Sequence, residues 1–263
     1  MFFSAAFAVS AVEEIDTHLN AQVWNEHMKP SEHLSEELLS EIVTQAVVRE
    51  IERRNALSSD TRPSILGPRQ RIIRVCRLIY TRQLSDSAGG NVSFRIGDHV
   101  YITPRYMGEH HQWEIAPDDI ILANVDGAVI EGSAERISRE GSVHFGVYKS
   151  FPEIGAVIHA HPTYCLVFAC SDREMPSVTA MAAHFRVGTV PLVEDAPPGS
   201  DELALHVIEA FKRRRQENKA LVVFMPNHGV VVAGKDIEEA FVILESVETN
   251  ARVFLMRRLL ETS

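Results

Sequence analysis

Two histidines stand two positions apart in the apolar stretch "GAVIHAHPTYC" at 155–165. Successive side chains of a β-strand point to opposite faces, so His159 and His161 would share one face, roughly 7 Å apart along the backbone. Two neutral imidazoles at that spacing can bind one metal ion. His228, in "NHG" at the end of another apolar run, is a third candidate ligand. Any one of these histidines alone would more often be a structural residue than a metal ligand. The prediction of a metal site therefore depends on all three side chains lying close together.

A carboxylate precedes the histidine pair. Glu140 and His144 are four residues apart in a predicted helix over 137–151, so they would share one helix face. That helix leads directly into the strand with the two histidines, which would let Glu140 reach the metal. A carboxylate beside a divalent cation can act as a ligand or as a proton acceptor. The alternative is a solvated or capping carboxylate near Ser138.

A loop of small residues, "GGNVS" at 89–93, lies between a predicted helix and a predicted strand. Its backbone N–H groups and the amide of Asn91 could hold an anion or a hydroxy-carbonyl group. An ordinary turn is the alternative interpretation of the same residues.

The elements that must position these residues follow from hydrophobic periodicity and turn signals. Helices are predicted over 69–84, 137–151, a segment after Pro162, 201–216 and 236–260. Strands are predicted over 92–96, 100–103, 120–125, 128–132, 155–162 and 188–193, with a hairpin over 220–234. Helices and antiparallel strands interleave without a regular βαβ pattern, which predicts an α/β fold with a mostly antiparallel sheet covered by helices. Residues 1–62 are expected to form an N-terminal helical extension, and residues 63–263 are expected to form the catalytic domain.

Composition narrows the functional classes. The 263-residue chain is 45% hydrophobic and 24% charged, as in ordinary soluble globular proteins, and its net charge is −10. The one basic run, at 212–216, is expected on a solvated helix face, so neither nucleic acid nor membrane is an expected partner. Cys76, Cys165 and Cys170 show no metal-binding spacing and are predicted to be buried free thiols. The apolar start lacks a basic segment, so a cytoplasmic location is expected.

The motifs "GGNVS", "ITP", "ISRE" with a histidine four residues on, "HAHP" and "NHG" occur in one order. In order and spacing they resemble the class II aldolase/adducin family over about residues 70–258. The resemblance implies a three-layer α/β/α fold with a central, mostly antiparallel sheet. It also implies a homotetramer with active sites at subunit interfaces, acting on a small anionic substrate.

The resemblance further implies a role for each matching residue. His159, His161, His228 and Glu140 would hold a divalent metal ion, expected to be Zn²⁺, with Mn²⁺, Mg²⁺, Co²⁺ and Fe²⁺ as alternatives. Glu140 would also be the catalytic acid/base, and Asn91, Thr103 and Ser138 would bind a substrate phosphate. The implied activity is that of a metal-dependent carbon–carbon lyase acting through a metal-stabilised enolate.

Three departures from the family pattern affect the substrate. Arg105 and Tyr106 replace a small pair, Arg139 replaces a small hydroxyl residue, and Ala180 stands where fuculose-type aldolases have a tyrosine acid. Guanidinium groups pair well with planar carboxylates, so we include Arg105 and Arg139 among the substrate-binding residues. His184 is a candidate contributor from a second subunit.

Two reactions are therefore predicted: decarboxylation of a hydroxylated aromatic or keto acid, or retro-aldol cleavage of a small hydroxy-carbonyl compound. The alternatives are a non-heme iron oxygenase on the same three histidines and a non-catalytic, adducin-like interaction module.

Overall fold

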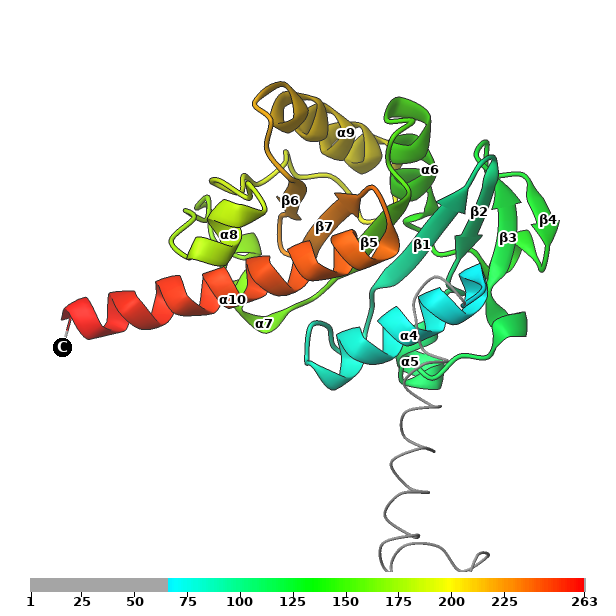
Figure 1. Ribbon diagram of the computed structural model, residues 1–263, viewed down its shortest axis with the longest axis horizontal. Helices are drawn as coiled ribbons and strands as arrows, with labels where there is room; N and C mark the ends of the chain where they lie inside the picture. The colour runs from blue at the N-terminus through cyan, green and yellow to red at the C-terminus, as the bar shows by residue number, and fades with distance from the viewer. Residues whose placement is uncertain (1–65, 263) are drawn as a thin grey trace, which may run out of the picture. The chain divides into compact units, whose positions relative to one another are not determined.

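A computed structural model describes residues 66–262, so the predicted N-terminal helical extension at 1–62 lies outside the described residues. Seven strands form one antiparallel sheet in the order β4-β3-β2-β1-β5-β7-β6 (Figure 1). The strands are β1 (Asn91–Ile96), β2 (His99–Ile102), β3 (Ile121–Asn124), β4 (Val129–Glu131), β5 (Ala156–Ala160), β6 (Leu221–Met225) and β7 (Gly229–Gly234).

The helices that the structure describes are α4 (Pro68–Thr81), α5 (Met107–His111), α6 (Gly141–Ser150), α7 (Thr163–Ala169), α8 (Ala180–His184), α9 (Asp201–Gln216) and α10 (Ile237–Thr262). Two short 3₁₀ helices, η1 (Pro117–Asp119) and η2 (Ala134–Arg136), complete the set within 66–262. None of the helices in this part of the chain combines the length and the apolar character needed to cross a membrane.

The helices cover both faces of the sheet. Helices α4, α7 and α10 pack on one face, and α6 and α9 pack on the other (Figure 1). Strand β5 alternates accordingly: Ile158 packs in the core with α10, and Val157 packs in the core with α6 and α9. His159 shares the face of Val157, because side chains two apart on a strand point the same way. The predicted three-layer α/β/α architecture is confirmed, and it directs His159 toward the α6 side.

The predicted helix over 137–151 is shorter at its N-terminus. Helix α6 begins at Gly141, with Glu140 as its N-cap residue. Ile137 is held in extended conformation by an isolated β-bridge to Pro104, so the chain cannot be helical there. Ser138 and Glu140 therefore lie in a short connecting segment before α6, beside the end of β5.

The predicted strand over 188–193 is wrong. Val190 and Leu192 form only isolated bridges, to Met175 and to Phe224. Pro191 lies between them and has no N–H group to continue a ladder.

The basic run at 212–216 is only partly solvated. Arg214 is 3% exposed, and its guanidinium donates to the carbonyl oxygens of Val187, Thr189 and Ala220, the last two at 2.6 Å. Arg214 therefore connects α9 to the segment that follows α8 and to the residue that precedes β6. One cysteine prediction also fails, since Cys76 and Cys165 are buried but Cys170 is exposed.

Candidate metal centre and active site

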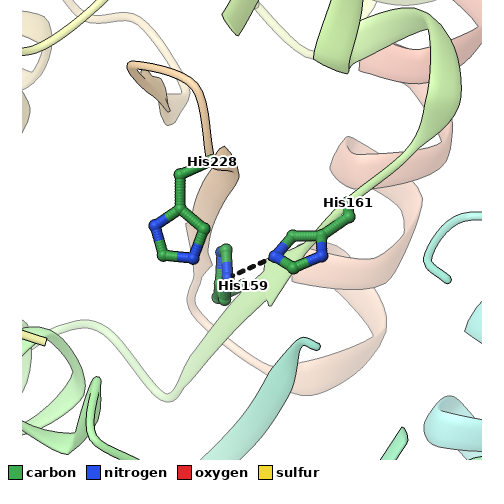
Figure 2. Close-up of side chains that lie close together, drawn as sticks. All are labelled: His159, His161 and His228. Atoms are coloured by element: carbon green, nitrogen blue, oxygen red, sulfur yellow. Dashed lines mark hydrogen bonds between the residues drawn. The ribbon is translucent and has the colours of Figure 1, made fainter. Parts of the chain in front are cut away.

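The three predicted histidines converge at one end of the sheet. His159 lies in β5, His161 lies just past the end of β5, and His228 lies in the turn between β6 and β7 (Figure 2). One ring nitrogen from each lies within 4.8 Å of the others, and the Nε2 atoms of His159 and His161 are 3.0 Å apart. Strand β7 pairs with β5 through Ala160 and Val230, so the turn with His228 lies beside His161.

Glu140 completes the group from the N-terminus of α6. Its two carboxylate oxygens lie 3.1 Å from Nε2 of His159 and 2.9 Å from Nε2 of His228. The amide nitrogen of Asn91 donates to the same carboxylate at 2.9 Å. Glu140 is only 8% exposed, so the partners of its carboxylate are protein groups rather than bulk water. Three imidazoles and one carboxylate thus face a common point.

Hydrogen bonds on the far side of two rings determine their tautomers. Nδ1 of His159 lies 3.1 Å from the carbonyl oxygen of Val230, and Nδ1 of His161 lies 3.2 Å from a carboxylate oxygen of Asp86. Both partners only accept hydrogen bonds, so each Nδ1 carries the hydrogen and each Nε2 presents a lone pair. Such outer partners are typical of metal-binding histidines. Nδ1 of His228 is buried and has no hydrogen-bond partner among residues 66–262.

The electrostatics agree with this arrangement. Burial lowers the pKa of His159 to about 3, so the ring is neutral at physiological pH. Burial alone would raise the pKa of Glu140, but a proton in this cluster is held better by the rings of His159 or His228 than by the carboxylate, and the amide of Asn91 donates to the ionised form, so the pKa lies below its ordinary value. The centre therefore combines the neutral ring of His159 with an ionised carboxylate.

This donor set fits a divalent cation. The Nε2 lone pairs of His159 and His161 face each other at 3.0 Å, and the Glu140 carboxylate faces the Nε2 lone pair of His159 at 3.1 Å. Acceptors that face acceptors repel one another unless a cation lies among them. Three imidazoles with a carboxylate are ligands that Zn²⁺ and related ions accept.

A cleft of about 110 Å³ opens over the four candidate ligands. Four of the predicted substrate-binding residues line it: Asn91, Arg105, Ser138 and Arg139. The remaining lining residues are Ala88, Gly89, Gly90, Tyr106, Met107, Gly108, Glu140, His159, His161 and His228. The loop "GGNVS" therefore lies beside the histidines, as the anion-site interpretation requires.

Two predicted residues lie elsewhere. Thr103 is fully buried, and its hydroxyl accepts a hydrogen bond of 3.0 Å from the backbone N–H of Val92, so it braces β1 instead of lining the cleft. His184 is exposed at the end of α8 and is not among the residues that line the cleft. A contribution of His184 to the site of another subunit stays a prediction.

Asp86 is a residue of the site that the sequence did not predict. Asp86 accepts from the N–H groups of Ala88 and Gly89 at 3.0 and 3.2 Å, in addition to holding His161. An Asp two residues before small residues is a common turn signal that could have revealed it. Tyr106 lines the cleft with a left-handed backbone (φ 62°), and the guanidinium of Arg105 lies 4.6 Å from its ring centroid.

Residues 70–255 match the family described as Class II Aldolase and Adducin N-terminal domain. The chain is 34% identical over 188 residues to an L-fuculose phosphate aldolase of Methanococcus maripaludis, covering 71% of this chain and 96% of the relative. It is 27% identical over 194 residues to a 3-oxo-tetronate 4-phosphate decarboxylase of Haemophilus influenzae, covering 72% and 87%. A solved structure of an L-fuculose 1-phosphate aldolase superposes with a TM-score of 0.65 at 28% identity, covering 73% and 87%.

These matches span the sheet, all seven strands and the four converging side chains. The family model covers well over half of the chain, and the relatives are named for aldol cleavage and for decarboxylation. The chain belongs to the class II aldolase and adducin family, and it is an enzyme of the lyase class.

Proposed function

We propose that the enzyme cleaves a carbon–carbon bond with a divalent metal held by His159, His161, His228 and Glu140. The observation that carries this proposal is the pair of contacts in which acceptors face each other at hydrogen-bond distance, Nε2 of His159 against Nε2 of His161 at 3.0 Å and against the Glu140 carboxylate at 3.1 Å. Zn²⁺ is the ion we expect, because imidazole-rich sets of this kind suit it best among common cellular ions. When bound, such a cation supplies a Lewis acid that polarises a substrate carbonyl and stabilises developing negative charge.

Glu140 is proposed as the acid and base. Its carboxylate is ionised and buried, so it can take the proton of a substrate hydroxyl that enters the cleft. The electron pair of the breaking carbon–carbon bond then stays on the carbon next to the carbonyl. In retro-aldol cleavage Glu140 returns the hydroxyl proton to that carbon. In decarboxylation CO₂ leaves without a proton and no hydroxyl has to be deprotonated, so Glu140 passes a proton from water to the carbon. In both reactions the enzyme is unchanged after one turnover. Asn91 and Ser138 keep the carboxylate and the substrate in place from the floor of the cleft.

We propose decarboxylation ahead of retro-aldol cleavage, with a carboxylate as the anionic group of the substrate. Two arginines line the cleft, and the buried Nε of Arg105 has no hydrogen-bond partner in the described part of the chain. A guanidinium holds a planar carboxylate with two parallel hydrogen bonds. The relative named as a decarboxylase supports this order, whereas the relatives named as aldolases support the alternative.

We also propose a cytoplasmic homotetramer whose sites lie at subunit interfaces, with His184 reaching the site of a neighbour. Light scattering on the purified protein tests the assembly. A monomer with full activity would contradict an interface site.

The test of function is turnover by the metal-loaded enzyme with two matched sets of compounds, hydroxy or keto acids and hydroxy-carbonyl phosphates. Release of CO₂ marks decarboxylation, and release of an aldehyde marks aldol cleavage. Arg105→Ala should raise KM for the acids about tenfold or more, because a charged hydrogen bond is lost. Arg173→Ala, at an exposed position outside the cleft, is the control and should leave KM unchanged. No cleavage of either set would contradict the proposal.

A further inference from the structure

Two rows of polar side chains face each other between β1 and α6. Residues two apart on a strand advance by about 6.7 Å, and residues four apart on a helix by about 6 Å, so two such rows can stay in step over three pairs. The strand row is Asn91, Ser93 and Arg95, and the helix row is Glu140, His144 and Tyr148. The first pair of the two rows lies at the candidate metal centre, and the last pair lies away from it.

Hydrogen bonds connect the two rows into one chain. Asn91 bonds Glu140 at 2.9 Å through its amide nitrogen, and His144 through its amide oxygen. Nδ1 of His144 lies 2.6 Å from the hydroxyl of Ser93, which in turn lies 2.7 Å from the hydroxyl of Tyr148. The members between the carboxylate and the tyrosine are buried, with Ser93 and His144 both at 0% exposure.

The donors and acceptors allow the hydrogen bonds of this series to run in one direction only, from the tyrosine toward the carboxylate. An ionised carboxylate only accepts hydrogen bonds, so Asn91 must turn its NH₂ group to Glu140 and its oxygen to His144. Nε2 of His144 must then carry the hydrogen, which leaves Nδ1 of the neutral ring to accept from Ser93. The oxygen of Ser93 accepts in turn from Tyr148, whose hydroxyl remains protonated because burial raises its pKa.

We propose that His144, Ser93 and Tyr148 are positioning residues that fix the amide of Asn91 and, through it, the carboxylate of Glu140. The proposal rests on the proposed role of Glu140. Without the donor on His144, the amide of Asn91 could rotate and present its oxygen to the carboxylate. Repulsion would then replace the hydrogen bond, and the carboxylate would leave its place between His159 and His228.

The first test compares two buried serines. Ser93→Ala interrupts the chain of hydrogen bonds. Ser246→Ala removes a buried hydroxyl on α10 that has no hydrogen-bond partner among residues 66–262. We expect Ser93→Ala to lower kcat about tenfold or more and to weaken Zn²⁺ affinity in a chelator competition by a similar factor, with KM nearly unchanged. Ser246→Ala should change neither quantity. Equal behaviour of the two variants would overturn the proposal.

The second test uses rescue at one position. Gln at position 144 can donate to Asn91 and accept from Ser93, whereas Leu can do neither but still fills the space. His144→Gln should retain more activity and Zn²⁺ affinity than His144→Leu. If the two substitutions are equivalent, or if Leu is the better one, packing and not hydrogen bonding explains the role of His144.

A third measurement needs neither metal nor substrate. In ¹⁵N NMR spectra of the metal-free protein at neutral pH, His144 should be neutral with its hydrogen on Nε2. Hydrogen on Nδ1, or a charged ring, would overturn the proposed direction of the chain. Failure of the proposed function is seen separately, as a wild-type protein that binds no Zn²⁺ and cleaves no substrate.

Discussion

Asn91 and His159 are directly opposite each other in the antiparallel pair β1–β5, and both reach the same oxygen of Glu140, at 2.9 and 3.1 Å. A slip of one residue in this pair would turn one of the two side chains to the opposite face of the sheet. The register of two central strands thus determines whether the amide, the imidazole and the carboxylate can meet.

The turn before β7 gives the first prediction. A Cβ atom on Gly229 would lie 2.5 Å from the carbonyl oxygen of Ala160 and 2.8 Å from the ring of His161. The backbone of β5 cannot yield cheaply, so Gly229→Ala should weaken Zn²⁺ affinity about tenfold or more, as measured by chelator competition. Gly97→Ala is the control: apart from its chain neighbours nothing lies within 4 Å of an added Cβ, and the change should cost only about 1 kcal/mol of stability from the positive φ. Unchanged Zn²⁺ affinity in Gly229→Ala would contradict the packing described for the site.

The buried arginine of α9 gives a prediction about stability. Arg214→Ala removes three charged hydrogen bonds, to the carbonyls of Val187, Thr189 and Ala220, and empties a nearly buried position, so the free energy of unfolding should fall by about 3 kcal/mol or more. Its exposed neighbour provides the control, since Arg213→Ala should change stability by less than about 0.5 kcal/mol. Urea denaturation of both variants measures the difference, and similar midpoints would show that Arg214 contributes no more than a surface residue.

Two buried histidines predict how stability depends on pH. Burial lowers the pKa of His144 to about 4 and that of His159 to about 3, from an ordinary value of 6.5. Below pH 6.5 the unfolded chain therefore takes up protons that the folded chain does not. Stability of the metal-free protein should be complete above about pH 6.5 and fall toward pH 4, by up to about 1.4 kcal/mol per pH unit for each ring.

His144→Gln isolates one of these groups. The variant should lose stability less steeply between pH 6.5 and pH 4, by about one proton in the slope of unfolding free energy against pH. A slope equal to that of the wild-type protein would mean that His144 is not neutral in the folded state.

Much of the site could be predicted from the sequence, because its signals are local. The two-residue spacing of His159 and His161 and the apolar runs of the hairpin around His228 are each visible within a few residues. Their convergence depends on the pairing of β5 with β7, which no local pattern specifies. The resemblance of ordered motifs supplied that information.

The failures have physical causes that are not local. The burial of Arg214 depends on carbonyls from a distant loop, and nothing in a run of basic residues indicates them. The start of α6 at Gly141 depends on the bridge between Ile137 and Pro104, which lie far apart in the chain. Thr103 braces a neighbouring strand because the register of β1 and β2 turns its hydroxyl to Val92.

The central claim is that His159, His161 and His228 hold a metal ion with Glu140. Its most direct test is the Zn²⁺ and total divalent metal content of the purified protein, before and after reconstitution, beside that of a His159→Ala, His161→Ala double variant. A His99→Ala, His206→Ala double variant removes two histidines outside the centre and is the matched control. We predict about one divalent ion per chain in the wild-type and control proteins and almost none in the site variant. A wild-type protein that takes up no divalent ion, or a site variant that retains it, would contradict the account.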